Sequence, residues 1–282
     1  MDFTIHDVFD WIKNEATGQF HLRGVLDGRI DEQYLPKLRE YMRRAVQQGI
    51  AARVDGRDGY FRPIDKTLEE IVWDDDGDIR AAPIKLPLGM HEYCYIFEPA
   101  LILVAGLWNQ GKTAFQINVV NLNIEEYANN IFFFVSEAAE LLKMRFGNLA
   151  VPVPRPKPFK IFRRNHNFAD VIEPDGFNVI DYLRTDMEKP SVVANEISAI
   201  YNKLKSGIAV VAMQKPQGRG IAYGGDPTAW EPMLYISIDK GFAKFEKIKV
   251  PKIIEGVDPY RIKFQFKIRK GVNFTDIVRV EE

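Results

Sequence analysis

The sequence predicts an α/β protein, a sheet with helices on its faces, preceded by a small helical domain that ends in a hairpin. Three observations predict this. From residue 83 onward, apolar runs typical of buried strands alternate with helix-like stretches. Residues 242–280 contain strand-like runs with no helix between them, which indicates antiparallel strands at the end of a mostly parallel sheet. Residues 1–64 instead show two helical apolar patterns followed by two short strand-like pieces.

The composition is that of an ordinary folded protein with room for a large core. Of 282 residues, 38 are Lys or Arg and 39 are Asp or Glu, so the formal net charge is −1. Contacts with DNA would therefore have to come from local basic faces. The single cysteine, Cys94, excludes a disulfide framework and suits a reducing compartment. The four histidines are too scattered to form a metal site.

No targeting or membrane segment is predicted. Residues 1–20 carry acidic side chains and lack a long apolar core. The longest apolar run, around residues 99–108, is too short to cross a bilayer. We therefore expect a cytoplasmic protein without membrane contacts.

The N-terminal domain, residues 1–64, has a pattern that resembles a winged helix-turn-helix. Residues 7–13 and 35–48 have helical apolar spacing, Gly49 ends the second helix, and residues 50–63 contain an Asp-Gly turn between strand-like pieces. Such a domain would place its basic helix in the major groove of duplex DNA and its hairpin on phosphates. The alternative is a solvated basic face on a protein-docking domain. The helix carries Lys37, Arg39, Arg43 and Arg44, and the hairpin carries Arg53, Arg57 and Arg62.

Residues 65–82, with the acidic stretch 74–78 at their centre, predict an exposed linker. Residues 83–282 then form the α/β domain. We expect strands at 100–105, 131–136, 177–182, 208–213, 233–238, 242–248, 260–268 and 274–280, and helices at 112–121, 137–146 and 191–205.

The segment 106–113 is a complete G-x-x-x-x-G-K-T phosphate loop between an apolar strand and a helix. In that setting, backbone N–H groups and the positive helix end surround a polyphosphate. Lys112 would reach the β- and γ-phosphates, and the Thr113 hydroxyl would bind Mg²⁺. The sequence thus predicts a site for ATP with Mg²⁺, with these phosphate-binding residues: Gly106, Asn109, Gln110, Gly111, Lys112, Thr113 and Ala114.

Three polar residues that end buried strands are candidates for the rest of the chemistry. Asp181 would complete the Mg²⁺ shell, because a carboxylate at the end of an apolar strand is otherwise costly. Glu137, at the tip of a strand expected beside the phosphate-loop strand, would orient the attacking water, with Glu140 as the second choice. Either glutamate could instead stabilise the start of a helix. Gln214 would sense the γ-phosphate, or else simply end its strand.

Taken together, the phosphate loop, residues 134–137, the stretch Val179–Leu183 and the stretch Val210–Gln214 resemble the RecA-like ATPase core of DnaB-type replicative helicases. The likeness covers residues 83–282 and is narrower for the variants carried by phages and mobile elements. A glycine-rich segment, residues 217–225, follows the strand that ends in Gln214, as it does in those proteins.

The resemblance implies a RecA fold, Mg²⁺-dependent ATP hydrolysis and a homo-oligomer, with a hexamer among the possible rings. It also implies single-stranded DNA at loops facing a central channel, and a basic residue of a neighbouring subunit that completes each site. The stretch corresponding to the family's closely spaced lysine and arginine is residues 247–252, which has no arginine. The candidates for this trans-acting residue are Lys249, Lys252, Lys267 and Arg269.

Two further basic stretches invite a DNA interpretation. Residues 154–164 mix cations with aromatic side chains, as single-strand-binding grooves do, or form a proline-stiffened connection with solvated charges. Lys215 and Arg219 lie beside glycines after Gln214 and could contact phosphates, or belong to a merely mobile loop.

We therefore expect an ATP-hydrolysing motor that acts on DNA in replication or recombination of a phage or mobile element, in a bacterial or archaeal cell or in a phage's host. The alternatives are a DNA-tethered switch controlled by ATP and a helicase loader or adaptor, neither of which would translocate.

Overall fold

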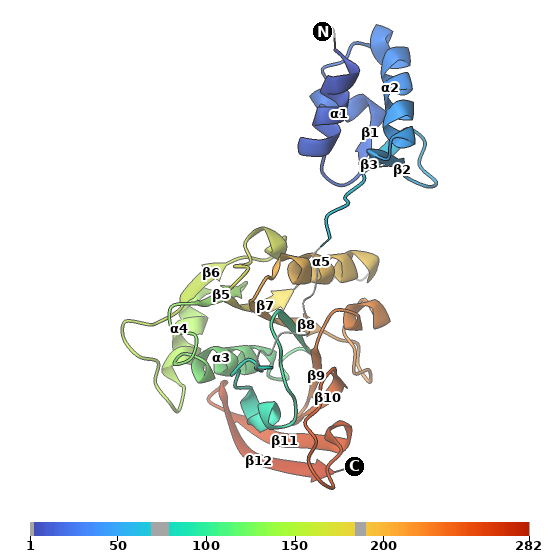
Figure 1. Cartoon of the computed structure of the whole chain (residues 1–282). Helices are drawn as coiled ribbons and strands as arrows, with labels where there is room; N and C mark the ends of the chain where they lie inside the picture. The colour runs from blue at the N-terminus through green and yellow to red at the C-terminus, as the bar shows by residue number, and fades with distance from the viewer. Residues whose placement is uncertain (1–2, 69–78, 184–189, 282) are drawn as a thin grey trace. The chain divides into compact units, whose positions relative to one another are not determined.

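A computed structural model describes residues 3–68, 79–183 and 190–281. The chain divides into two compact units, Met1–Gly77 and Asp78–Glu282 (Figure 1). Residues 74–78, the acidic centre of the predicted linker, lie outside the described residues.

The first unit is built from two amphipathic helices that pack on a three-stranded sheet. Helix α1 (Ile5–Asn14) begins at a capping box in which the Thr4 side chain accepts a hydrogen bond from the Asp7 backbone N–H and the Asp7 carboxylate accepts one from the Thr4 backbone. Helix α2 (Leu35–Gln47) buries Leu38, Met42 and Ala45 against it. Between the helices lie the short 3-10 segments η1 (Leu22–Gly28) and η2 (Glu32–Tyr34).

The sheet of this unit has the strand order β1-β3-β2. Strands β2 (Ala51–Arg53) and β3 (Tyr60–Pro63) form the expected antiparallel hairpin, with Ala52 opposite Arg62. Gly56 and Gly59 have φ angles of +70° and +72°, a conformation that glycine adopts most easily and that lets the connecting segment turn. Strand β1 (Phe20–His21) pairs with β3 and is too short to have produced a sequence pattern.

The second unit is a nine-stranded sheet with the order β12-β11-β10-β9-β4-β8-β7-β5-β6. The strands β4 to β9 are parallel to one another, and β10, β11 and β12 continue the sheet antiparallel. The bounds are β4 Ala100–Gly106, β5 Ile131–Val135, β6 Lys160–Arg163, β7 Phe177–Leu183, β8 Ile208–Gln214, β9 Leu234–Asp239, β10 Phe242–Ile248, β11 Ile262–Arg269 and β12 Asn273–Glu281.

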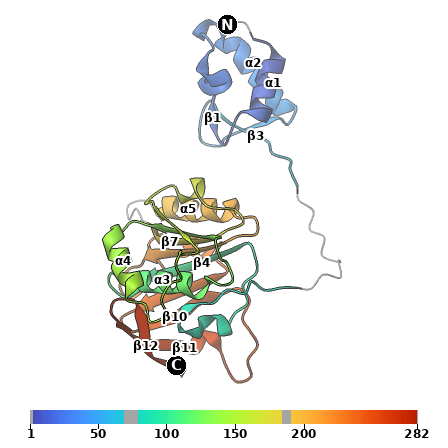
Figure 2. The same cartoon turned by 90° about the vertical axis from the view of Figure 1, so that its left-hand side faces the viewer.

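Helices cover both faces of the parallel part of this sheet (Figures 1 and 2). Helix α3 (Lys112–Leu122) and helix α4 (Ala139–Gly147) pack on one face, where residues such as Phe115 and Leu142 join a large apolar core. Helix α5 (Pro190–Lys203) covers the other face, with Ile197 and Ile200 in a second core. Strands β4, β7 and β8 are buried on both sides, which explains their uninterrupted apolar sequences.

The predicted fold class is confirmed as far as a mostly parallel α/β sheet with antiparallel strands at its C-terminal side. Strand β8 lies between β4, which leads into the phosphate loop, and β7, which carries Asp181. One expectation was wrong, because β5 is not beside β4: β7 and β8 separate the two. Strand β6, at the edge of the sheet, was not predicted because its residues are mostly exposed and show no apolar run. None of the helices in the described part of the chain has the length and apolarity needed to cross a membrane.

Candidate functional site: the phosphate loop and the end of β7

The phosphate loop connects β4 to the start of α3. Gly111 precedes the helix with a φ angle of +107°, where a side chain would be strained. A Cβ atom at Gly111 would also lie 2.5 Å from Cδ1 of Ile268 on β11. Gly106 is less constrained: its Cβ atom would meet the Ile238 carbonyl and the Lys112 side chain at 3.0 Å, a tight contact. The backbone angle at Gly111 and the close packing around Gly106 both favour glycine in the motif.

Lys112 is held inside this loop. Its Nζ donates hydrogen bonds to the carbonyl oxygens of Gly106 (2.9 Å) and Leu107 (2.7 Å). Burial lowers the pKa of Lys112 to about 8, an effect that nearby Asp181 partly offsets. A phosphate group entering the loop would supply negative charge to an amine that is poorly solvated, which favours binding of an anion.

Asp181 lies in the interior near the first turn of α3. It is 1% exposed, and neither carboxylate oxygen has a hydrogen-bond partner of normal geometry among the described residues. Burial raises the pKa of Asp181 to about 6; the nearby Thr113 hydroxyl opposes this rise, and Glu137 adds to it. An unpaired buried carboxylate is costly unless a cation accompanies it.

These residues fit a magnesium ion that accompanies a nucleotide. Mg²⁺ takes oxygen ligands and is commonly held by one or two protein oxygens together with phosphate oxygens. The Asp181 carboxylate and the Thr113 hydroxyl are oxygen donors of this kind; Thr113 lines the cavity, and Asp181 lies buried beside it. Within the described ranges, no group of three or more His, Cys, Asp or Glu could hold a metal alone, so the nucleotide would supply ligands too.

Glu137 follows β5 and lies on the wall of the same cavity, which has a volume of about 570 Å³. Its carboxylate pairs with Arg145 of α4 at 2.8 Å, and both side chains are about one quarter exposed. Glu137 precedes α4 and so is not part of that helix. Glu140 takes the first turn of the helix and is exposed, outside the residues that line the cavity.

Arg145 was not among the predicted site residues. Arg145 follows Glu137 by eight residues, which is close to two helical turns. In the helix predicted for this stretch, that spacing would have indicated that the two side chains lie on the same face. Glu137 and Arg145 pair because α4 begins shortly after β5 ends. The sequence alone did not predict where α4 begins.

Gln214 lies at the end of β8 and lines the cavity together with Glu137 and Lys112. Its carbonyl accepts a hydrogen bond from the Tyr223 N–H, which ties the strand end to the following glycine-rich segment. The structure thus brings the phosphate loop, Glu137 and Gln214 to one cavity, with Asp181 in the interior close to Thr113.

Gln116, also absent from the predictions, fixes α3 to the strand ends. Its buried Nε2 donates to the carbonyl oxygens of Ile180 (3.2 Å) and Val210 (3.3 Å). These are backbone groups of β7, where Ile180 directly precedes Asp181, and of β8, which ends at Gln214. The contact fixes the helix that carries Lys112 and Thr113 relative to both strands.

The hairpin of β11 and β12 covers the same helix. Ile268 packs on Gly111, and the turn residue Gly271 lines the cavity. The Asn118 side chain donates to the Val272 carbonyl at 2.7 Å and to the Ala114 carbonyl at 2.8 Å, which joins the hairpin turn to α3.

The candidates for a trans-acting residue are in different situations. Lys252 donates to the His91 carbonyl at 3.0 Å and lies over the Tyr95 ring. Lys267 and Arg269 both pair with Asp276, at 3.2 and 3.7 Å. Lys249 is exposed and directly follows β10.

Lys215 differs from the expectation of a phosphate contact. Its side chain is 2% exposed, and Nζ bonds to Asp239 and to the Arg219 carbonyl, each at 2.7 Å. The buried ion pair makes Lys215 a structural residue of the loop in this conformation. Asp239 lies 24 residues later, so the sequence gave no sign of the pair.

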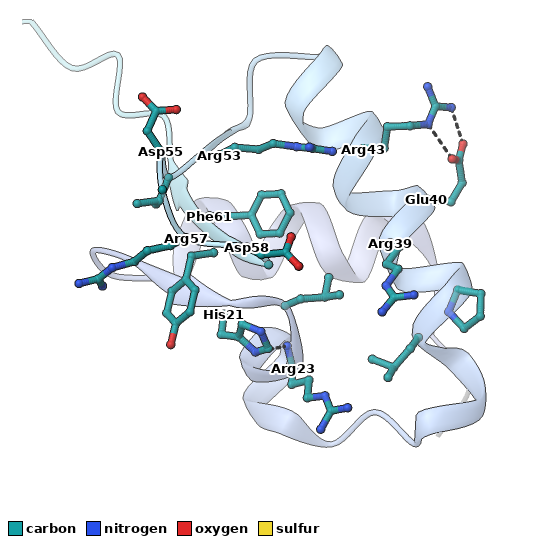
Figure 3. Close-up of a pocket in the computed structure, with 17 residues that line it drawn as sticks. His21, Arg23, Arg39, Glu40, Arg43, Arg53, Asp55, Arg57, Asp58 and Phe61 are labelled. Atoms are coloured by element: carbon teal, nitrogen blue, oxygen red, sulfur yellow. Dashed lines mark hydrogen bonds and ion pairs between the residues drawn. The ribbon is translucent and has the colours of Figure 1, made fainter.

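The first unit contains a basic cleft of about 980 Å³ between α2 and the hairpin of β2 and β3 (Figure 3). Of the predicted DNA contacts, Arg39, Arg43, Arg53 and Arg57 line this cleft, joined by His21 and Arg23, which were not predicted. Lys37, Arg44 and Arg62 lie outside it. Lys37 stacks over the Phe3 and Tyr41 rings instead.

Glu40 organises part of the cleft. Its carboxylate accepts two hydrogen bonds from Arg43, both of 2.7 Å, and one of 2.9 Å from Arg44. These bonds lower the pKa of Glu40 to about 2. By contrast, Arg39 and Arg53 have no ion-pair partner among the described residues, and Figure 3 shows Arg53 extending toward α2.

No protein-family model matches the chain, and neither does any curated protein. Among solved structures, it is similar to a KaiC-like protein from the hyperthermophilic archaeon Pyrococcus horikoshii OT3. The identity is 19% over 72% of this chain and 100% of that one, with a TM-score of 0.47.

Proposed function

We propose that the chain is a magnesium-dependent ATPase that acts on DNA, with a RecA-like motor unit and an N-terminal winged-helix unit. The observation that supports it best is Asp181: a buried carboxylate with no hydrogen-bond partner of normal geometry, close to the Thr113 hydroxyl and the Lys112 amine of a complete phosphate loop. A phosphate loop alone would support only nucleotide binding.

The residues would divide the work as follows. The N–H groups of residues 109–114 and the Lys112 amine bind the triphosphate, and Thr113 and Asp181 hold Mg²⁺. When bound, the ion neutralises charge that develops on the phosphates. Glu137 orients the water that attacks the γ-phosphate. Before that, Glu137 is paired with Arg145, so the pair must loosen or shift before the carboxylate can accept a proton.

Gln214 couples the nucleotide to the rest of the unit. Its side chain lines the cavity and its carbonyl holds the segment 215–225 through Tyr223. Loss of the γ-phosphate would release the side chain and change the position of this segment. We assign segment 215–225 to single-stranded DNA, with Arg219 as its available cation and the buried Lys215 as its support.

The winged-helix unit would bind duplex DNA through the basic cleft. The strand order β1-β3-β2, with α2 beside the hairpin, supports this proposal. Arg39 on α2 would face base edges, and Arg53 and Arg57 on the hairpin would contact phosphates. In the assembly, we propose that Lys249 of one subunit completes the site of the next. Lys249 is exposed and directly follows β10, and no ion pair holds it among the described residues, whereas Lys267 and Arg269 pair with Asp276.

A second candidate function is an ATP-controlled, DNA-tethered switch without translocation. Two observations favour it. Lys252, Lys267 and Arg269 already have partners within their own chain, and the remaining candidate for the trans-acting residue, Lys249, is a lysine and not an arginine. A weak trans-acting residue would give slow hydrolysis, which suits a timer better than a motor. A motor and a switch are both compatible with a role in replication or recombination of a mobile element, and both are compatible with helicase loading.

ATP turnover of the full chain, measured with and without single-stranded DNA, separates these functions. A motor is expected to accelerate when DNA is added, and the Lys249→Ala variant should lose most of that acceleration. Turnover that is intact but indifferent to DNA argues for the switch. Absence of any Mg²⁺-dependent turnover contradicts both.

A further inference from the structure

Arg145 is the one arginine that lines the nucleotide cavity in the described part of the chain. It lies in the last turn of α4 and reaches the same cavity as Glu137. Lys112 and Thr113 of the phosphate loop line this cavity too, and its size is typical of a small-molecule site. The Arg145 guanidinium therefore lies where it can contact a bound triphosphate as well as Glu137.

The ion pair with Glu137 leaves most of the guanidinium available. Nη1 of Arg145 donates one hydrogen bond to Oε2 of Glu137 at 2.8 Å. Nε and Nη2 have no hydrogen-bond partner among the described residues. A guanidinium carries five N–H donors in a planar fork. Its unused donors can bind a second anion, and the oxygen atoms of a phosphate group match the geometry of the fork.

The charge of Arg145 also acts on the proposed magnesium site. Burial raises the pKa of the Asp181 carboxyl group; Glu137 adds to the rise, and the positive charge of Arg145 opposes it. Because such an effect falls off with distance, Arg145 lies near the carboxylate that we assign to Mg²⁺. The γ-phosphate of a bound nucleotide would lie near the same ion, since Mg²⁺ bridges β- and γ-phosphate oxygens. The cavity wall and this charge effect both indicate that Arg145 is close to the reacting phosphate.

A triphosphate would compete with Glu137 for Arg145. The γ-phosphate carries more negative charge than a carboxylate and offers three oxygen atoms. Both side chains of the ion pair are about one quarter exposed, and pairs of that exposure stabilise a fold only weakly. Arg145 can therefore leave Glu137 for the γ-phosphate at little cost. ADP lacks the γ-phosphate and would leave the pair intact.

We propose that Arg145 is a catalytic residue of its own subunit's site: it exchanges Glu137 for the γ-phosphate when ATP binds, and this exchange frees Glu137 to act as the base. The proposal rests on the function proposed above and adds a residue to it. In the reaction, the water oxygen forms a bond to the γ-phosphorus, the bond from that phosphorus to the β,γ-bridging oxygen breaks, and ADP leaves with the electron pair. Glu137 accepts the proton of the water, and Arg145 stabilises the negative charge on the γ-phosphoryl oxygens.

An arginine from the same subunit also explains how the site could work without an arginine in residues 247–252. Lys249 of a neighbouring subunit would bring a compact positive charge, whereas a guanidinium binds two phosphate oxygens at once. Other phosphate-loop enzymes receive this arginine either from their own chain or from a partner. In this arrangement, Arg145 sets the basal rate of hydrolysis, and Lys249 supplies the response to assembly and DNA.

The test compares Arg145→Gln and Arg145→Lys with the wild type in the full chain. The control is Lys143→Gln, which removes one positive charge from an exposed position of the same helix, outside the cavity. Calorimetry with Mg²⁺ present measures the affinities for ADP and for a non-hydrolysable ATP analogue. Retention of ADP with aluminium fluoride, which imitates the transferring phosphoryl group, is measured in parallel. Single-turnover hydrolysis and thermal unfolding complete the set.

Arg145→Gln should bind ADP almost like the wild type, because the guanidinium does not contact ADP. It should bind the ATP analogue about tenfold more weakly, because charge-assisted hydrogen bonds to the γ-phosphate are lost. It should fail to retain ADP with aluminium fluoride, and its single-turnover rate should fall by about 10³-fold. Arg145→Lys should recover part of the analogue affinity but little of the rate, because an ammonium group cannot bind two oxygens in a planar fork. The control should match the wild type throughout.

Equal losses of affinity for ADP and for the ATP analogue would overturn the proposal, since they would show that Arg145 only supports the cavity wall. Retention of ADP with aluminium fluoride at the wild-type level, or a normal single-turnover rate, would overturn it too. A wild-type chain that binds nucleotides without Mg²⁺-dependent turnover contradicts the proposed function instead. In that case, a selective loss of analogue affinity in Arg145→Gln still supports the contact with the γ-phosphate, and an unselective loss contradicts it.

Discussion

Burying the ionised Asp181 carboxylate costs folding free energy, and the proposed chemistry needs that carboxylate where it lies. The pKa raised from 3.8 to about 6 corresponds to about 3 kcal/mol of lost stability when the carboxylate is ionised in the folded protein. Such a residue persists in a fold when a ligand compensates for it. The same reasoning explains why a strand-end aspartate was recognisable in the sequence: the surrounding residues of β7 are apolar and buried.

The variant Asp181→Asn should be more stable than the wild type at pH 8 without metal, by up to about 3 kcal/mol. The Asp181 carboxyl group keeps its proton to a higher pH in the folded state than in the unfolded state, because its pKa is raised on folding. The wild type therefore loses stability as pH rises from about 4 to about 6, and the advantage of the variant disappears below pH 4. Urea unfolding of both proteins at several pH values measures this. An advantage that does not change with pH would show that Asp181 is not the titrating group.

The pair of Glu137 and Arg145 predicts a separation of binding from hydrolysis. Glu137→Gln should bind ATP normally and lower kcat by about 10²-fold or more, because the water loses its base. Nucleotide affinity and single-turnover rate measure the two effects. Glu140→Gln is the matched control, since Glu140 is exposed and outside the cavity. Equal rates for the two variants would remove Glu137 from its proposed role.

At the scale of elements, the hairpin of β11 and β12 supports the phosphate loop. Asn118→Ala breaks the bond between α3 and the hairpin turn and leaves the Val272 carbonyl without its donor. We expect a loss of about 1–2 kcal/mol in the free energy of unfolding, with weaker nucleotide binding. The control Asn202→Ala changes an exposed side chain of α5 and should cost little. Equal stability of the two variants would mean that this contact does not hold the hairpin.

The sequence predicted those helices and strands whose buried residues recur with the regular spacing of a helix or form a continuous apolar run. The strands with continuous apolar runs and helices α3 and α5 were found nearly at their observed bounds. What depends on distant partners was not predictable. The exposed edge strand β6, the pairing of Lys215 with Asp239 and the anchoring of α3 by Gln116 all require the order of strands in the sheet. For the same reason, the sequence analysis wrongly placed β5 beside β4.

The same limit applies to the candidate site. The phosphate loop follows β4, Glu137 follows β5 and Gln214 ends β8, so their positions at one edge of the sheet followed from the motif and the alternation. Asp181 lies two residues before the end of β7. Arg145 and Gly271 come from elements whose register is set by tertiary packing.

At the scale of the whole molecule, the proposal gives each unit its own nucleic-acid site. In the full chain, Arg53→Gln should weaken duplex binding and make its salt dependence less steep by about 0.9 per lost phosphate contact. Arg62→Gln is the control, since Arg62 belongs to the same hairpin but lies outside the cleft. Fluorescence titrations at several salt concentrations measure both. Indistinguishable behaviour would favour a protein-docking role for the cleft.

The central claim is that the phosphate loop and Asp181 form a single site for Mg²⁺ with ATP. Calorimetric titration of a non-hydrolysable ATP analogue, with and without Mg²⁺, tests it most directly in the wild type and in Asp181→Asn. The account predicts that Mg²⁺ strengthens binding to the wild type and that the variant loses this gain while keeping its metal-free affinity. An equal gain from Mg²⁺ in both proteins would contradict the account.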